Sequence, residues 1–248
     1  MPVIRRPGQL PLRRGAGWSW QDWAGPAAFG EQVPMEASWH QLGPGTAGPV
    51  FPLAGTEALT YVIAGGGTAT AGGEDFPLTP ESVLWLAGCD GIRLAAGTGR
   101  LEVLIAETAP AGEPPAPLRK LLTAAELPHL VSTRDTRDRL DLITDEVPVG
   151  AKRIRADRII YHPGDTSAAH YHTACYHVFC VLAGSGLLHD GSSSHRLTTG
   201  MSALAGPGEV HWFENDRPGD FAFVEFWAPP PAATKWMVPA DRCTWAAG

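Results

Sequence analysis

Residues 164–184 read GDTSAAHYHTACYHVFCVLAG, and this stretch decides how the chain folds and what it binds. His170 and His172 stand two residues apart, so on a β-strand their side chains point to the same face. His177 follows after a short turn that would begin a second strand, and His211 would arrive from a third. Imidazoles that converge between strands form a metal site. The stretch therefore predicts a four-histidine metal centre walled by β-strands.

The other five histidines show no comparable spacing. A histidine without such a partner is usually a surface residue or a hydrogen-bonded core residue. We therefore leave five histidines out of the predicted site: His40, His129, His162, His189 and His195.

The composition fits a folded β protein. Of the 248 residues, 44% are hydrophobic and 18% are charged, which is enough apolar side chain for a core. The 29 glycines and 23 prolines, spread between short apolar runs, favour frequent turns between strands. A net charge of -7 gives no support to nucleic-acid or membrane-surface binding. Neither a membrane-spanning apolar window nor a signal peptide is seen, so we expect a cytoplasmic protein.

The chain contains a weak internal repeat. Residues 59–67 (LTYVIAGGG) match residues 178–186 (VFCVLAGSG) at a shift of 119 positions (178 minus 59). At this shift the three histidines of the quoted stretch correspond to Phe51, Leu53 and Ala58. The first half therefore keeps the fold signal and lacks the metal ligands, which predicts one metal site per chain.

These motifs resemble those of the cupin superfamily, and the repeat resembles a bicupin. The usual first motif is G-x5-H-x-H-x3 or 4-E-x6-G, and the chain fits it with His177 in place of the glutamate. The usual second motif is G-x5-P-x-G-x2-H-x3-N. Here Gly200, Gly208, His211 and Asn215 fit it, with Gly206 at the proline position. The resemblance implies an all-β protein of two tandem jelly-roll β-barrels, with the metal in the second.

Four regions are expected along the chain. Residues 1–30 are predicted to be an N-terminal arm, and residues 31–108 a barrel without metal ligands. Residues 109–150 are predicted to be a linker with a short helix, because Leu118–Leu127 combines helix formers with apolar residues at helical spacing. Residues 151–248 would form the metal-binding barrel and a tail.

The replacement of the ligand glutamate affects the choice of metal. Four neutral imidazoles leave the full charge of a divalent ion in place. This favours one Fe, Ni, Cu or Zn ion per chain and disfavours Mn.

Several functions are compatible with such a site. The resemblance to histidine-rich cupins favours a metal-dependent enzyme of the dioxygenase type that acts on a small organic molecule. One alternative is a non-redox Lewis-acid enzyme, such as a cyclase, isomerase, lyase or aminohydrolase. Another is a non-catalytic cupin that binds a small molecule. The family habit of pairing barrels suggests a homodimer, and neither nucleic acid nor membrane is expected as a partner.

Strand alternation also suggests residues around the metal. Three side chains are expected to line the substrate pocket on this ground: Phe179, Val181 and Phe213. Cys175, two residues before His177, is expected to line the mouth of the pocket because of that spacing. Glu225 and Tyr161 are polar residues on predicted strands, and we expect them to be the catalytic proton-transfer groups. A carboxylate beside a divalent cation would be ionised and could act as a base.

Overall fold

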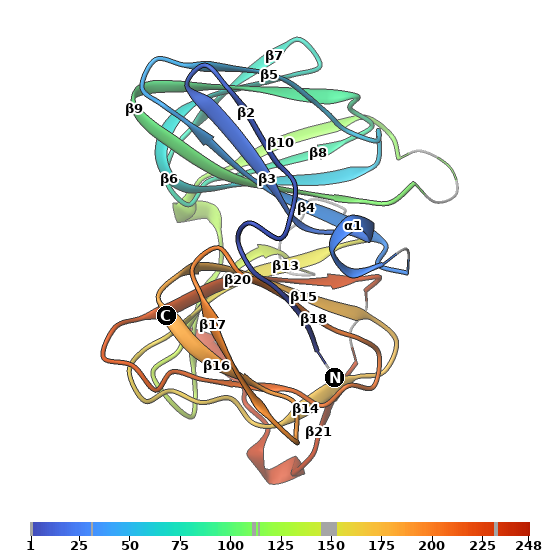
Figure 1. Ribbon diagram of the computed structural model, residues 1–248, viewed down its shortest axis with the longest axis vertical. Coiled ribbons are helices and arrows are strands. Elements are labelled where there is room, and N and C mark those ends of the chain that lie inside the picture. The colour runs from blue at the N-terminus through green and yellow to red at the C-terminus, as the bar shows by residue number, and fades with distance from the viewer. Residues whose placement is uncertain (1, 31, 111–112, 114, 145–152, 231–232) are drawn as a thin grey trace. The chain divides into compact units, whose positions relative to one another are not determined.

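The computed structural model describes residues 2–30, 32–110, 113, 115–144, 153–230 and 233–248 (Figure 1). The chain forms two compact units, of which the first is Gly8–Leu127 and the second combines Met1–Pro7 with Pro128–Gly248. Both units are built almost entirely from β-strands, which confirms the predicted all-β class. Among the described residues, no helix has the length and apolar character needed to cross a membrane.

The first unit is a β-barrel whose main sheet has the strand order β10-β8-β6-β9-β4-β3-β2, with β5 added to β9 and β7 to β6. Its elements are β2 (Leu12–Gly15), β3 (Trp18–Ala24), α1 (Pro26–Phe29), β4 (Met35–Leu42), β5 (Ala47–Pro52), β6 (Glu57–Ala71), β7 (Glu74–Leu78), β8 (Val83–Ala87), β9 (Gly91–Thr108), β10 (Leu118–Leu122) and the 3-10 helix η1 (Ala124–Glu126). Aliphatic side chains from facing strands fill its interior.

The second unit has the main sheet order β1-β18-β15-β20-β13-β12-β11-β22, with the smaller sheets β14-β21 and β17-β16-β19. Its elements are β1 (Val3–Arg5), β11 (His129–Ser132), β12 (Asp138–Ile143), β13 (Arg155–Tyr161), β14 (His170–His172), β15 (Tyr176–Ala183), β16 (Ser185–His189), β17 (Ser194–Thr198), β18 (Ser202–Ala205), β19 (Trp212–Glu214), β20 (Phe221–Ala228), β21 (Thr234–Trp236), the 3-10 helix η2 (Pro239–Asp241) and β22 (Trp245–Ala247). Alternate residues of β20 face inward, so Phe221 and Phe223 enter an aromatic core.

One pair of glycines shows that the two units repeat the same backbone. Gly65 and Gly184 correspond at the shift of 119 residues (184 minus 65), and both have positive φ, at 78° and 74°. A Cβ atom would lie 1.7 Å from the carbonyl oxygen of Arg100 at Gly65, and 1.9 Å from that of Asp220 at Gly184. Only glycine fits this close approach of two strands, so the repeated glycine marks the same point in each barrel.

The helix predicted for Leu118–Leu127 was wrong. Leu118–Leu122 is strand β10, which pairs antiparallel with Val83–Ala87, and only the short turn η1 follows it. Pairing with β8 satisfies the backbone hydrogen bonds of this segment, so tertiary context overrides its helix propensity.

The separate N-terminal arm predicted for residues 1–30 is not what the structure forms. Val3–Arg5 pairs with β18 in the second unit, whereas the chain from Gly8 onward belongs to the first. The repeat in fact begins in this region, because Asp22 faces Ser38 across β3 and β4 just as Asp141 faces Asp157 across β12 and β13. The sequences of these strands have diverged, and the strand register reveals the correspondence.

Candidate metal centre

The structure brings His170, His172, His177 and His211 together in the second barrel. One ring nitrogen from each lies within 4.8 Å of the others. Strand β14 supplies the first two histidines and β15 supplies His177. His211 bridges to His170 through a pair of backbone hydrogen bonds, at 2.8 and 3.1 Å. Thus the i, i+2 spacing and two further strands place four imidazoles around one point.

Neighbouring acceptors fix which nitrogen of three rings carries the proton. The backbone oxygen of Ala168 lies 2.8 Å from Nδ1 of His170, and that of Glu209 lies 2.9 Å from Nδ1 of His211. A carbonyl oxygen only accepts, so both Nδ1 atoms donate and both Nε2 atoms keep a free lone pair. His177 is reversed when Glu225 is ionised, because its Nε2 lies 3.0 Å from Oε2 of that carboxylate and donates to it, which leaves Nδ1 unprotonated.

This arrangement leaves two lone pairs facing each other. Nδ1 of His177 is 3.0 Å from Nε2 of His211, and with Glu225 ionised neither nitrogen has a proton to share. Two nitrogen ligands bonded at about 2.1 Å and at right angles around a metal lie about 3.0 Å apart. The donor set therefore fits a transition-metal ion by both its chemistry and its spacing. His172 is held more loosely, with Thr234 and Trp227 both at 3.4 Å from its ring nitrogens.

The four rings are neutral and ready to bind a cation. Burial lowers the pKa of His170, lowers that of His172 to about 2, and lowers those of His177 and His211 well below the ordinary value. The mutual repulsion of the charged rings lowers the pKa of His172, His177 and His211 further. Metal binding competes with few protons at such a site.

Glu225 lies behind His177 in a buried group of charged residues. Its side chain faces Asp157 across β13 and β20, and Arg139 approaches Asp157 with its Nε 3.1 Å from Oδ2. Burial raises the pKa of Asp157 well above its ordinary value, and the charge of Glu225 adds to this rise. Burial also raises the pKa of Glu225, to about 7, against the opposing effects of Asp157 and Arg139. Burial therefore raises the pKa of both carboxyl groups, and Oε2 of Glu225 lies within hydrogen-bond distance of Nε2 of His177.

Three of the four side chains expected to line the substrate pocket lie in the hydrophobic core of the second barrel. Phe179 lies directly under the histidines, with its ring centroid 4.1 Å from that of His177 and 5.6 Å from that of His211. Phe213 packs edge-on against Phe179, and both belong with Val181 to the aromatic core. These side chains leave the metal site closed on its inner side. Cys175 is buried, and burial raises the pKa of its thiol to about 11.

Tyr161 does not reach the histidine cluster by any contact that the structure shows. Its ring packs with Phe213, Phe221 and Phe223, and its hydroxyl accepts a hydrogen bond from Arg137 at 3.3 Å. Burial raises its pKa to about 12. The geometry therefore places Tyr161 in the barrel core, in place of the expected proton-transfer role.

Two tryptophans beside the histidines were missed from the sequence. Trp227 stacks on His177 with ring centroids 4.8 Å apart, and Trp236 lies 5.1 Å from His170. Trp236 is on β21, which pairs with the ligand strand β14, so its position depends on a pairing between distant segments. Both tryptophans and His170 are half-buried, whereas His172, His177 and His211 are buried. The open side of the site is therefore aromatic.

The first barrel has apolar residues at the metal-ligand positions. Phe51 pairs with Ile92 as His170 pairs with His211. Phe51 and Ile92 each lie 119 positions before the corresponding histidine (170 minus 51 and 211 minus 92). Ala58 stands at the position of His177 by the same shift. This barrel therefore has lost the imidazoles and kept the pairing that would present them.

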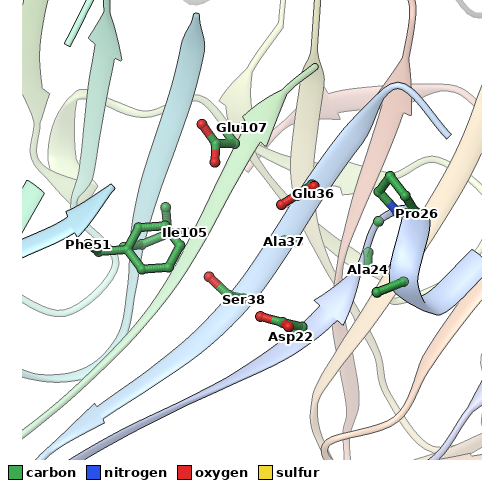
Figure 2. Close-up of a pocket in the computed structure, with 11 residues that line it drawn as sticks. Asp22, Ala24, Pro26, Glu36, Ala37, Ser38, Phe51, Ile105 and Glu107 are labelled. Atoms are coloured by element: carbon green, nitrogen blue, oxygen red, sulfur yellow. The ribbon is translucent and has the colours of Figure 1, made fainter. Parts of the chain in front are cut away.

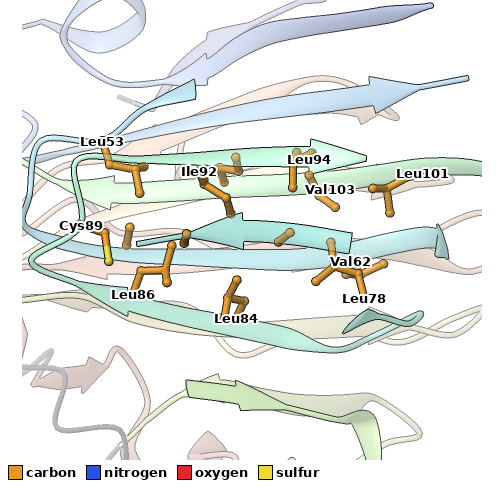
Figure 3. Close-up of a cluster of buried hydrophobic side chains, with 14 of the residues drawn as sticks. Leu53, Val62, Leu78, Leu84, Leu86, Cys89, Ile92, Leu94, Leu101 and Val103 are labelled. Atoms are coloured by element: carbon orange, nitrogen blue, oxygen red, sulfur yellow. The ribbon is translucent and has the colours of Figure 1, made fainter. Parts of the chain in front are cut away.

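A small cavity of about 50 Å³ in the first barrel is lined in part by Phe51, the residue at the position of His170 (Figure 2). Its walls include Asp22, Glu36, Ser38 and Glu107 together with Phe51, and no imidazole is among its lining residues. Burial raises the pKa of Glu107, against a hydrogen bond from the Ala54 amide. Two further ligand-equivalent residues, Leu53 and Ile92, lie in the aliphatic core (Figure 3).

Comparison with known families identifies the class of the second barrel. Residues 157–227 match the family model described as "Cupin domain", and this range contains the four histidines and Glu225. Residues 157–227 of the second barrel therefore form a cupin domain. The comparison with curated proteins found no match.

Solved structures resemble the whole chain. The Lactobacillus farciminis oxalate decarboxylase formate complex has a TM-score of 0.75 and 13% identity, covering 95% of this chain and 88% of that one. The E. coli protein Ylba, described with the family model DUF861, has a TM-score of 0.71 and 18% identity, covering 94% and 92%. A mutant of Bacillus subtilis oxalate decarboxylase has a TM-score of 0.74 and 13% identity, covering 95% and 79%. At these identities the likeness shows the fold, and it confirms the two predicted jelly-roll barrels.

Proposed function

We propose that the protein is a metal-dependent enzyme that acts on a small organic molecule, with dioxygenase-type oxidation as the favoured reaction. The observation that carries the proposal is the convergence of four imidazoles whose ring nitrogens lie within 4.8 Å of one another, with Nδ1 of His177 and Nε2 of His211 3.0 Å apart. A complete set of buried, neutral imidazoles is costly to maintain unless it binds a cation. A divalent transition metal bound there would supply Lewis acidity and, if it is redox-active iron, the activation of dioxygen.

The chain's own residues give the site two different sides. Phe179 and the aromatic core below it exclude water from the interior of the barrel. The substrate is therefore proposed to approach past His170, between Trp227 and Trp236, where a flat or apolar molecule can stack. Glu225 is turned away from this side and bonds to His177, so it is not proposed as the catalytic base.

The position of Glu225 also affects which metal ion the site is expected to bind. We propose one divalent ion per chain and keep iron, nickel, copper and zinc as the candidates, because imidazole suits these ions. A carboxylate one imidazole away offsets part of the ion's charge, so four neutral donors no longer argue strongly against manganese. A Bacillus subtilis oxalate decarboxylase with a similar fold is described with Mn(II) centres.

Metal analysis combined with an oxygen electrode tests the proposal. The protein is purified without a histidine tag, and its metal content is compared with that of a His170→Ala/His172→Ala variant. A His129→Ala/His195→Ala variant is the matched control, because both of its histidines pair with aspartates outside the cluster. We expect about one metal ion in the wild type and in the control, and none in the first variant.

Oxygen uptake then separates the possible reactions. Iron with uptake that depends on an added enol, diketone or thiol supports the dioxygenase proposal. Zinc without oxygen uptake would favour the Lewis-acid alternative, and equal metal content in all three proteins would overturn the metal site. A cytoplasmic homodimer without nucleic-acid or membrane partners also stays a proposal. A monomer in light scattering at micromolar concentration would exclude the dimer.

A further inference from the structure

Glu225 is placed to act on a metal ligand and not on a substrate. Its Oε2 atom lies 3.0 Å from Nε2 of His177, and the residue is only 7% exposed. The other nitrogen of the same ring, Nδ1, points to His211 at 3.0 Å. The carboxylate therefore decides which edge of the His177 ring faces the histidine cluster.

Resting on the proposed metal-dependent function, we propose that Glu225 is a positioning residue for the metal centre. It orients His177 so that Nδ1 faces the metal, and it keeps a carboxylate one imidazole away from the ion. A carboxylate that accepts the second N–H of a ligand histidine fixes the ring's tautomer and increases its basicity. The chain thereby returns to the site part of the negative charge that is lost when a histidine replaces a glutamate ligand.

The neighbours of Glu225 hold its carboxylate in place. Asp157 occupies the opposite register position on β13 and has no exposed surface. Arg139 Nε lies 3.1 Å from Asp157 and supplies a positive charge on the far side of the pair. Four side chains thus follow one another toward the histidine cluster, in the order Arg139, Asp157, Glu225 and His177. A carboxylate packed in this way has little freedom to turn from His177 toward another partner.

The first barrel offers an internal comparison. Ile105 pairs with Ser38 and Thr60, as Glu225 pairs with Asp157 and Phe179, so Ile105 stands at the position of Glu225. Ala58 stands at the position of His177. The barrel that lacks the metal ligands therefore also lacks the carboxylate.

One acidic residue in the same neighbourhood behaves differently. Asp141 of the second barrel corresponds to Asp22 of the first, so this acid is present with or without the histidines. Ile105 at the position of Glu225 in the first barrel shows that the fold does not require a carboxylate there. Its presence follows the presence of the metal ligands, as expected of a residue that serves them.

The first experiment replaces Glu225 by glutamine, which has nearly the same shape and no charge. Co(II) and Zn(II) affinities are measured by competition with a chromophoric chelator, and the visible absorption bands of the Co(II) protein are recorded. We expect affinity to fall about 10- to 100-fold and the Co(II) bands to shift. Glu102→Gln is the matched control, because Glu102 is a buried glutamate of the first barrel, and it should change neither readout.

A second substitution tests whether the carboxylate acts through the ligand. In the Glu225→Gln protein, His177→Glu places a carboxylate directly at the ligand position, and we expect metal affinity to recover to within several-fold of the wild type. Wild-type affinity and an unchanged Co(II) spectrum in Glu225→Gln would overturn the proposal. Weakened affinity with an unchanged spectrum and no recovery would also overturn it, since that pattern indicates a general loss of stability.

A further variant covers a failure of Glu225→Gln to fold. Glu225→Asp keeps the charge but withdraws the carboxylate by one methylene, so weaker Co(II) binding and a shifted spectrum are expected. Unchanged values would overturn the proposal. The outcome is separate from that of the proposed reaction: if Glu225→Gln weakens metal binding and no substrate supports oxygen uptake, the oxidation is rejected and the positioning role stands. If the wild type binds no metal, both are rejected.

Discussion

The N-terminal strand β1 should stabilise the barrel that holds the histidines. The rest of that barrel begins only at Pro128, so 122 residues (6–127) separate it from the end of β1. Val3, Ile4 and Arg5 pair with Leu204, Ala203 and Ser202 of β18. A strand pairing of this length forms about two or three backbone hydrogen bonds, each contributing about 1 kcal/mol to stability. Ile4 also packs against the aromatic core, which adds about 1 kcal/mol for its partial burial. Removing residues 1–7 should therefore cost about 3–4 kcal/mol.

Hydrogen–deuterium exchange measures this cost separately in each barrel. A loss of about 3–4 kcal/mol should speed exchange about 10²- to 10³-fold in amides that open with global unfolding of the second barrel. Peptides covering β15 and β18 should show the change, and peptides from the first barrel should keep their wild-type exchange. Pro7→Ala, an exposed position outside β1, is the control and should have no effect. Wild-type exchange of β15 and β18 in the truncated protein would refute the reasoning.

Three further outcomes follow from the packing and charge of the second barrel. Phe223→Ala should lower the free energy of unfolding by about 3–5 kcal/mol in urea titrations, because Phe223 is fully buried, whereas exposed Val50→Ala should change it little. Gly184→Ala should be more destabilising than Gly191→Ala in the same assay: both have positive φ, but only Gly184 meets a backbone oxygen, and equal effects would contradict this. Hydrogen bonds to Asp220 and Asp138 raise the pKa of His162 in the folded protein despite some burial. The contribution of His162 to the stability of the fold is therefore full below its unfolded pKa of about 6.5, and it is lost as the pH rises through the higher folded pKa. Thermal melts should therefore show a decline above about pH 6.5 that is reduced in His162→Gln.

The sequence was sufficient for the β class, the repeat and the convergence of four histidines. These depend on local rules: alternation on a strand, glycine at a close approach, and ligand spacing. The role of Glu225 depends instead on register across strands, since β20 brings it beside β13 and β15. The sequence indicated a polar residue on a strand and could not show that it faces a ligand.

The errors in the segments before and after the first barrel have the same origin. Leu118–Leu122 has helix formers and yet pairs with β8, and nothing local to it indicates that partner. Likewise, Val3–Arg5 is too short to read as a strand without knowing that β18 is beside it. Trp20 stands where Arg139 stands in the second barrel, so the repeat is hidden from sequence comparison in this region.

The apolar replacements in the first barrel have a consequence for how the protein acquires its metal. With Phe51, Ala58 and Ile92 at the ligand positions, that barrel forms the same strand pairing without an imidazole at any of these positions. The fold therefore does not need a metal to assemble, unlike small domains whose folding is driven by metal binding. We expect the second barrel likewise to fold first and load its ion afterwards. The identity of the bound ion in a cell would then follow the supply of metals available to the folded protein.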